Sequence, residues 1–394
     1  MRSDAVSGAA KGERLFCLDA LRGLDMVFLA WFNSFAVAVL GCFDGSPAWL
    51  RDQFRHPPWG GFTAHDQIMP CFIFMCGAAV PLALGRFVAD GRPTRGFFVH
   101  VARRFAMLWV LGMFVGGALT SFDVMQIKPY SNTLQAIAAG YVIAAFVFLV
   151  RARWLRFAIP FALALLYTAL LCGFGDMTPA GNFANKVEMW CVGALGFPEG
   201  AKAYSTGNYT WFLTTLMFGA MTVWGMNCTE IVRSGLPQWR KAGLLFAFAA
   251  LLTAVGWVSQ AWVPCIKQIY TISFTCRSIG LCVALLAALY VVTDIWRLRR
   301  GWWLFTLFGQ FSLTAYLACN AFWGVTNAFV LRFLEPGVKS MVSPEVFKVF
   351  VSLGMGAAIT LVLVLRRRLK APCAKACDLV QFTPQTTHQQ GMTP

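Results

Sequence analysis

The segment from Cys17 to Gly41 reads CLDALRGLDMVFLAWFNSFAVAVLG, an apolar run with few charged side chains. Such a run is long enough to cross the hydrocarbon core of a bilayer, which is about 30 Å thick. At that depth every backbone N–H and C=O must be paired within the segment, so a helix is the spanning form that this pattern favours. The segment therefore predicts a transmembrane helix near the start of the chain.

The rest of the chain has the same character. Of its 394 residues, 58% are hydrophobic and 13% are charged, and the mean hydropathy is +0.62. These values exclude a soluble globular protein and a disordered chain. Ten apolar windows are predicted to span the membrane: 17–41, 67–85, 105–122, 133–150, 155–174, 209–229, 243–261, 270–293, 302–324 and 345–365. We therefore expect an all-α polytopic membrane protein, a bundle of about ten transmembrane helices.

The positions of the basic residues predict how this bundle is oriented in the membrane. Arg and Lys cluster in 86–104, 151–156, 233–241, 297–300 and 366–370, which are alternate connections between the predicted helices. The positive-inside rule then predicts that both termini are cytoplasmic. The same rule explains the net charge of +16, so the charge does not indicate a nucleic-acid partner.

Composition divides the chain into three parts. Residues 1–13 form a polar N-terminal segment without the apolar core of a cleavable signal, and residues 14–370 form the predicted transmembrane domain. The polar tail 371–394 is predicted to be disordered. Cys373 and Cys377 in this tail lack further ligands, and no metal site is predicted.

The first predicted helix carries polar side chains at its cytoplasmic end and also deeper in the membrane. Asp19 and Arg22 are three residues apart and share a helical face at its cytoplasmic end. They form either a plain ion pair or a site where the arginine meets phosphate groups from the cytosol. Asn33 lies roughly 21 Å deeper, where an amide requires partners and either joins helices or faces a cavity.

The predicted outer loops carry the remaining candidate catalytic and substrate-binding residues. His56 precedes tight turns at Pro57-Pro58 and Gly60-Gly61 that would fold it back over the bundle. Its imidazole is either a proton acceptor in catalysis or a solvated loop side chain. Asp66 begins the second helix, where it is either a capping residue or a partner in that chemistry. The loops 42–66 and 175–208 are rich in Trp and Asn, which suit a carbohydrate or, alternatively, anchor the protein at the membrane interface.

These residues together resemble the catalytic region of the heparan-α-glucosaminide N-acetyltransferase family and its bacterial relatives in the transmembrane acyltransferase superfamily. The matching positions are Asp19 to Gly23, Asn33, His56, Trp59, Gly61, Thr63, Asp66, Pro70, Phe72, Phe74 and Gly77. Weaker similarity continues through Tyr209 to Trp211, Pro264 to Ser273 and Gly309 to Tyr316. Ala136 and Gln310 depart from residues that are common in the family, arginine and asparagine respectively.

The resemblance implies transfer of an acetyl group from cytosolic acetyl-CoA to the amine of a terminal hexosamine on the opposite side of the membrane. It assigns the catalytic histidine to His56 and its asparagine partner to Asn33. We expect His56 to act as general base, Asn33 to stabilise the oxyanion and Asp66 to hold the imidazole or the acceptor. An acetyl-histidine intermediate is the competing mechanism.

Further residues are expected to bind the two substrates. Asp19 and Arg22 are candidates for the cofactor, as is Arg277, which is predicted near the middle of an apolar helix and there marks either a structural ion pair or the CoA channel. The candidates for the sugar are Trp59, Thr63, Asn208, Trp211 and Lys267. No metal is expected.

The expected setting is a bacterial inner membrane, with lipids around the helices and the site opening to the periplasm. A homodimer is expected from the resemblance. Two other functions stay open: an O-acetyltransferase of a polysaccharide or cell-wall sugar, in which His56 activates a hydroxyl, and a small-molecule transporter.

Overall fold

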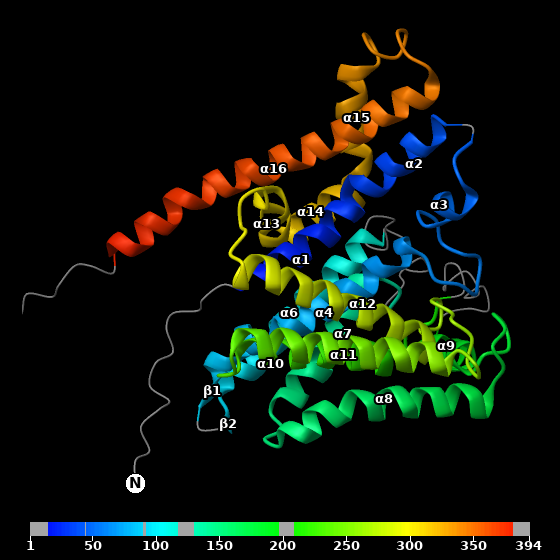
Figure 1. Cartoon of the computed structure of the whole chain (residues 1–394), viewed down its shortest axis with the longest axis vertical. Coiled ribbons are helices and arrows are strands. Elements are labelled where there is room, and N and C mark those ends of the chain that lie inside the picture. The colour runs from blue at the N-terminus through cyan, green and yellow to red at the C-terminus, as the bar shows by residue number, and fades with distance from the viewer. Residues whose placement is uncertain (1–14, 44, 90–91, 117–129, 197–208, 381–394) are drawn as a thin grey trace, which may run out of the picture.

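The computed structural model describes residues 15–43, 45–89, 92–116, 130–196 and 209–380, and these are mostly helical (Figure 1). The elements at the N-terminal side are α1 (Phe16–Val27), a π-helical turn η1 (Phe28–Phe32), α2 (Asn33–Gly41), α3 (Ala48–Asp52), the 3-10 turn η2 (Ala64–Gln67), α4 (Ile68–Ala78), α5 (Val80–Leu84), η3 (Gly85–Phe87), the antiparallel strands β1 (Val88–Ala89) and β2 (Arg92–Pro93), and α6 (Arg95–Val115).

The remaining elements complete the bundle. They are α7 (Thr133–Phe148), α8 (Arg153–Phe174), α9 (Phe183–Ala194), α10 (Thr215–Arg233), α11 (Gln238–Ser259), α12 (Ile272–Tyr290), the π-helical turn η7 (Val291–Ile295), α13 (Trp303–Gln310), α14 (Ser312–Asn320), α15 (Trp323–Leu334) and α16 (Pro344–Val380). The last helix therefore continues past residue 370, and residues 381–394 lie outside the described part of the chain.

Seven of the described segments are long and apolar enough to cross a membrane. They are Phe16–Gly41, Ala64–Phe87, Arg95–Val115, Arg153–Phe174, Gln238–Ser259, Ile272–Ile295 and Pro344–Leu369. A helix pair bent by 74°, α14 with α15, brings the number to eight when it is counted as one span. The structure is consistent with a helical membrane protein, and the count of ten spans and the cytoplasmic termini stay predictions.

Two predicted windows differ from the observed helices. The window 302–324 is not one helix, because α13 ends at Gln310 and α14 is a separate helix. The prediction rested on hydropathy, which does not register such a break. The helix predicted to begin at 105 begins at Arg95, so Arg103 and Arg104 lie within α6 rather than in a loop. Long basic side chains are compatible with a helix where their heads reach a polar surface or cavity.

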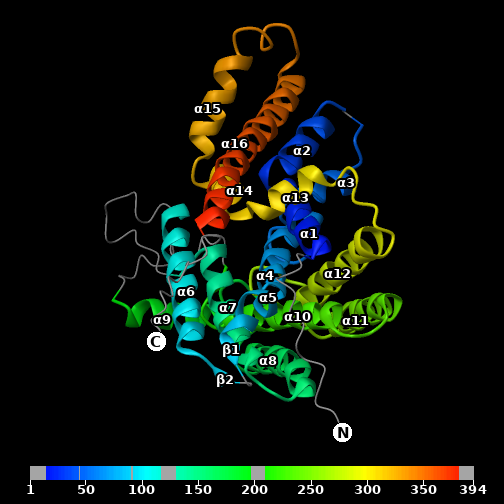
Figure 2. The same cartoon turned by 90° about the vertical axis from the view of Figure 1, so that its left-hand side faces the viewer.

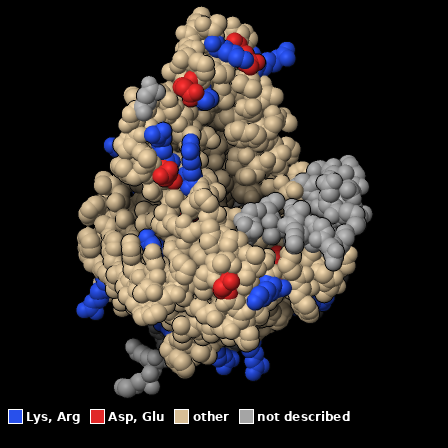
Figure 3. Space-filling model, turned by 90° about the vertical axis from the view of Figure 1, so that its right-hand side faces the viewer, with Lys and Arg blue, Asp and Glu red and all other residues tan. Residues whose placement is uncertain are grey.

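The helices run between two opposite ends of the molecule. The short helix α3 and α9 lie at one end, and β1 and β2 lie at the other (Figures 1 and 2). The first end carries the described parts of the predicted outer loops, 42–43, 45–66 and 175–196, and the second carries the basic connection after α5 as far as it is described. Most of the surface at the α3 end carries neither Lys, Arg, Asp nor Glu (Figure 3).

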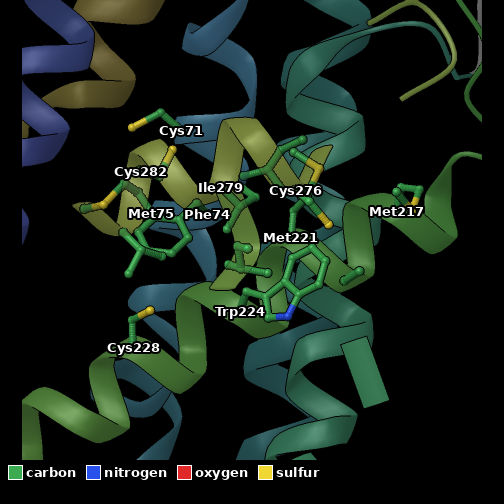
Figure 4. Packing of buried hydrophobic residues seen from close by; sticks show 14 of the residues in the cluster. Cys71, Phe74, Met75, Met217, Met221, Trp224, Cys228, Cys276, Ile279 and Cys282 are labelled. Carbon is green, nitrogen blue, oxygen red and sulfur yellow. The ribbon is translucent and has the colours of Figure 1, made fainter. Parts of the chain in front are cut away.

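Four helices, α4, α7, α10 and α12, form the centre. Nearly all of α10 from Met217 to Thr229 is buried, and Met221 and Trp224 of this helix lie near Phe74 of α4 and Ile279 of α12 (Figure 4). Methionine and cysteine side chains fill the spaces between the aromatic rings, which suits an irregular interface. This dense centre positions the loops at the α3 end.

Glycines set the closest helix contacts. A Cβ on Gly77 would lie 1.7 Å from the Thr222 carbonyl oxygen, and one on Gly225 would lie 2.0 Å from the Phe74 carbonyl oxygen. The two glycines thus let the backbones of α4 and α10 touch, which is how small residues drive helix association inside membranes.

We expect Gly225→Ala to destabilise the protein by about 3 kcal/mol, because the new methyl group overlaps backbone that a rotamer change cannot move. The matched control is Gly243→Ala in α11, where nothing lies within 4 Å of the added Cβ. That change should preserve or raise stability by up to about 1 kcal/mol. Apparent melting temperatures in one detergent compare the two, and equal melting temperatures would contradict the close-contact role.

Candidate active site

The loop that carries His56 is fixed to a second loop far along the chain. The Gly61 N–H donates to the Cys265 carbonyl at 2.9 Å, and Gly60 forms a β-bridge with Ile266. Gly61 has a φ of +141°, a region that favours glycine, and a Cβ there would meet the Pro57 ring at 3.1 Å. The glycine and proline turns therefore fold His56 back over the helices.

Asp66 is the centre of a buried polar cluster. Its Oδ2 accepts the backbone N–H of Thr63 at 3.2 Å and lies 3.1 Å from the Thr63 hydroxyl, which completes a capping box at the start of η2. Its Oδ1 lies 2.6 Å from His56 Nδ1 and 3.1 Å from Lys267 Nζ. The carboxyl group of Asp66 therefore caps the 3-10 turn, as one reading of the sequence predicted, and also binds the histidine, while its part in catalysis stays a prediction.

The three side chains of this cluster differ in exposure. The Asp66 side chain is 0% exposed and that of Lys267 7%, whereas the His56 side chain is 46% exposed. Burial lowers the pKa of Lys267, and the neighbouring Asp66 carboxylate opposes that shift. Lys267 Nζ also lies 3.3 Å from His56 Nδ1. Among the described residues the other ring nitrogen, Nε2, has no hydrogen-bond partner, so it is available to a substrate.

His56 opens onto a cavity of about 280 Å³, here called the histidine cavity. Its walls combine the polar cluster with aromatic and apolar side chains: Leu29, His56, His65, Ile68, Met69, Phe72, Thr133, Tyr209, Trp211, Lys267, Tyr316 and Asn320. The His65 ring packs against the His56 ring with 4.3 Å between centroids. His65 thus lines the same cavity as His56.

A second and larger cavity of about 540 Å³, here called the basic cavity, adjoins the first. Its basic lining residues are Arg22, His100, Arg103 and Arg104. Phe72, Thr133 and Tyr316 line both cavities. These shared residues form a common wall between the basic cavity and the histidine cavity.

The cofactor candidates fall in different places. Arg22 lines the basic cavity, with its NH1 3.7 Å from Asp19 Oδ1. Arg277 lines neither cavity: its guanidinium donates to Gln260 Oε1 at 2.8 Å and lies 4.0 Å from the centroid of the Trp257 ring. Because α12 begins at Ile272, Arg277 lies in its second turn, and the predicted position near the middle of the helix is wrong.

Asn33 does not line the histidine cavity. It follows η1 directly and lies four residues after Leu29, which does line the cavity. Its Oδ1 is buried and has no hydrogen-bond partner among the described residues. The π-helical turn before it is a feature that often occurs at functional sites.

The sugar-binding candidates also separate. Trp211 and Lys267 line the histidine cavity, whereas Thr63 binds Asp66 and the Trp59 indole N–H donates to the Met177 carbonyl at 2.8 Å. Asn208 lies outside the described residues. No group of three or more His, Cys, Asp or Glu side chains in the described part of the chain is arranged to hold a metal ion.

Sequence reasoning missed several lining residues. Arg103 and Arg104 were interpreted only as topology signals, although a pair of adjacent arginines next to an apolar run is also compatible with an anion site, and His100 was not singled out. Tyr316 was noted only as part of a weak similarity. No local signal distinguishes it, because its role follows from tertiary packing, which brings its ring to 6.4 Å from the ring of Phe72 in α4.

Glu188 is a further buried group that the sequence did not reveal. Its Oε2 accepts the backbone N–H groups of Trp211 and Phe212 at 2.9 and 3.1 Å, and its side chain is fully buried. Burial raises the pKa of Glu188 to about 7, and the two backbone hydrogen bonds oppose that shift. Glu188 of α9 therefore holds the segment that places Trp211 in the cavity wall.

This raised pKa predicts a pH dependence of stability. Between its ordinary pKa of 4.5 and about 7, the folded protein binds a proton at Glu188 that the unfolded chain releases. The free energy of unfolding should therefore fall as pH rises through this window, by up to about 3 kcal/mol. Glu188→Gln keeps a neutral acceptor and should remove this part of the slope. Apparent melting temperatures from pH 4.5 to 8 test it, and parallel curves for both proteins would contradict it.

Comparison with known proteins points to one kind of protein. No protein-family model matches the chain. It is 22% identical over 373 residues to human heparan-alpha-glucosaminide N-acetyltransferase, which covers 78% of this chain and 53% of that protein. It is 25% identical over 142 residues to the mouse protein of the same name, covering 34% of this chain and 19% of that protein. The chain thus spans about half the length of the human relative and less of the mouse one, and it is a distant relative of heparan-alpha-glucosaminide N-acetyltransferases.

Proposed function

We propose that this protein is a membrane-bound N-acetyltransferase that moves the acetyl group of acetyl-CoA onto the amine of a terminal hexosamine resembling glucosamine. One observation carries the proposal: the Asp66-bound imidazole of His56 opens onto a cavity that shares three wall residues with a cavity rich in arginine. The names of the distant relatives support the reaction class.

The basic cavity suits the nucleotide end of acetyl-CoA. CoA carries several phosphate groups, and arginine binds phosphate through paired N–H donors. Arg22, Arg103 and Arg104 line one chamber. The positive-inside rule supports a cytoplasmic location for it, because Arg103 and Arg104 belong to one of the basic clusters of the predicted topology. The thin pantetheine arm then extends past Phe72 and Thr133 toward His56.

The chemistry follows from the hydrogen bonds of the imidazole. Nδ1–H donates to Asp66 Oδ1, which leaves the lone pair of Nε2 to accept a proton from the attacking amine. The amine nitrogen bonds to the thioester carbonyl carbon, the C–S bond breaks, and the imidazolium returns the proton to the CoA thiolate. Asn33 supplies a hydrogen bond to the developing oxyanion in this scheme.

An acetyl-histidine intermediate is the second mechanism, and kinetics separate the two. If Nε2 itself attacks the thioester, acetyl-CoA alone should release about one thiol per protein in a burst before any sugar is added. Direct transfer gives no such burst, and both substrates must be bound before any thiol appears.

The deciding experiment uses the purified protein in detergent with acetyl-CoA and glucosamine. We expect thiol release that depends on the sugar, and N-acetylglucosamine detected by mass spectrometry. A product that loses its acetyl group in mild alkali would instead indicate O-acetylation. If no amino sugar raises thiol release above the uncatalysed background, the enzyme proposal fails. Transport of a small molecule then becomes the better explanation.

The proposal includes a homodimer in a bacterial inner membrane, surrounded by lipid, with the histidine cavity open to the periplasm. Cys42 is exposed at the α3 end, so a membrane-impermeant maleimide applied from the periplasm should label it in a variant that keeps only this cysteine. If Cys42 were labelled only after the membrane is broken, the α3 end would face the cytoplasm, opposite to the proposed orientation. The mass of the purified particle gives the oligomeric state.

A further inference from the structure

Lys267 occupies a position that substrate binding alone does not explain. Its ammonium group touches both members of the Asp66–His56 pair, at 3.1 Å from Asp66 Oδ1 and 3.3 Å from His56 Nδ1. Its side chain is 7% exposed. A lysine that served only to bind a sugar would direct its ammonium group into the cavity, whereas this one is engaged by the carboxylate behind the imidazole.

The loop that carries Lys267 holds it rigidly. The Lys267 carbonyl accepts the N–H of Tyr270, a residue with φ of 46°, and Ile266 pairs with Gly60 across the β-bridge. A non-glycine residue with positive φ is uncommon and costs free energy, so surrounding contacts must maintain it. The loop therefore fixes Lys267 and the His56 loop as one unit.

We propose that Lys267 is a positioning residue that sets the charge state of His56: its ammonium balances Asp66 and so leaves the imidazole neutral and ready to accept a proton. This inference rests on the role of His56 as the base in the proposed function. With Lys267 and Asp66 both ionised, the cluster is neutral while His56 is neutral, and it gains one positive charge when His56 takes a proton.

The electrostatic surroundings of His56 support this role. The titratable groups that face it are Asp66 and His65 from η2, Lys267 from the loop before α12, and Tyr209 and Tyr316 in the cavity wall. Asp66 is the one acidic side chain of this set among the described residues. Without Lys267 its charge would be unbalanced, and that charge favours a protonated imidazole at a distance of 2.6 Å. A protonated His56 has no lone pair to accept a proton from an amine.

Carbethoxylation with diethyl pyrocarbonate tests this charge role directly, because the reagent attacks only the neutral imidazole. The rate of modification at His56 is followed against pH, and peptide fragmentation distinguishes His56 from His65. We expect the midpoint pH to rise by about one unit or more in Lys267→Met, a tenfold change in the protonation ratio. Lys267→Arg keeps the charge and should keep the wild-type midpoint. Asp66→Asn removes the anion and should lower the midpoint.

Two results would overturn the inference: an unchanged midpoint in Lys267→Met, or an equal shift in Lys267→Arg and Lys267→Met. Monodisperse elution of each variant in detergent shows that the shift does not come from unfolding. The measurement needs no acetyl transfer, so it is independent of the activity assay. If the wild-type protein released no thiol from acetyl-CoA, the proposed function would fail while the carbethoxylation result still decided the role of Lys267.

Discussion

His56→Ala is expected to reduce kcat/KM for acetyl transfer by about 10²- to 10⁴-fold, the range typical for loss of a general base. The reason is geometric, since His56 is the group in the histidine cavity that combines a carboxylate partner on one ring nitrogen with a free second nitrogen. Thiol release from acetyl-CoA with glucosamine measures the loss. The imidazole is about half exposed, so its removal should leave the melting temperature nearly unchanged.

His65→Gln is the matched control. His65 packs against the same ring and lines the same cavity, but no carboxylate in the described residues holds it. We expect a loss of less than about tenfold, in the range of an altered contact rather than a lost base. Equal losses in both variants would mean that the cavity shape, and not the His56 base, limits the reaction. Normal turnover by a folded His56→Ala protein would end the proposed mechanism in either form.

Much of the helical architecture could be predicted because hydropathy records it directly. Runs such as 17–41 and 155–174 correspond to Phe16–Gly41 and Arg153–Phe174 within a few residues. The break after Gln310 could not be predicted in this way, since α13 and α14 are both apolar.

The site was predictable only where its residues are close in sequence. His56 and Asp66 are ten residues apart and share one loop, and the structure brings their side chains together. Lys267 is 211 residues from His56 and reaches it only because two loops pair at Gly60 and Ile266. Such a contact is determined by tertiary packing, and a single sequence carries no signal for it.

The basic cavity could not be predicted from the sequence either, because the charge of its arginines has another explanation. Arg22 and Arg104 come from α1 and α6, and the run of arginines in α6 has a sufficient explanation in membrane topology. The residues that line both cavities, Phe72, Thr133 and Tyr316, come from three further helices and include two hydroxyl groups and two aromatic rings. Their significance lies in the wall that they give to both chambers, and this is visible only after the chain has folded.

This shared wall leads to the second large effect, which we expect from Thr133→Trp if acetyl-CoA binds as in the proposed function. Thr133 begins α7, lines both cavities and lies with its hydroxyl 3.6 Å from Met69 Sδ. An indole there would fill the space through which the pantetheine arm must extend, so acetyl transfer should fall by about 10²-fold or more, as when reacting groups are held out of reach.

Binding of the nucleotide end separates this effect from damage to the protein. 3′,5′-Adenosine diphosphate carries phosphates but no pantetheine arm. Its Kd should stay within about threefold of the wild-type value, which corresponds to less than 1 kcal/mol. Thr133→Ser keeps the hydroxyl and the space and should retain activity. If Thr133→Trp transferred acetyl groups at the wild-type rate, the thioester would have to reach His56 by another route, and the basic cavity would lose its place in the reaction.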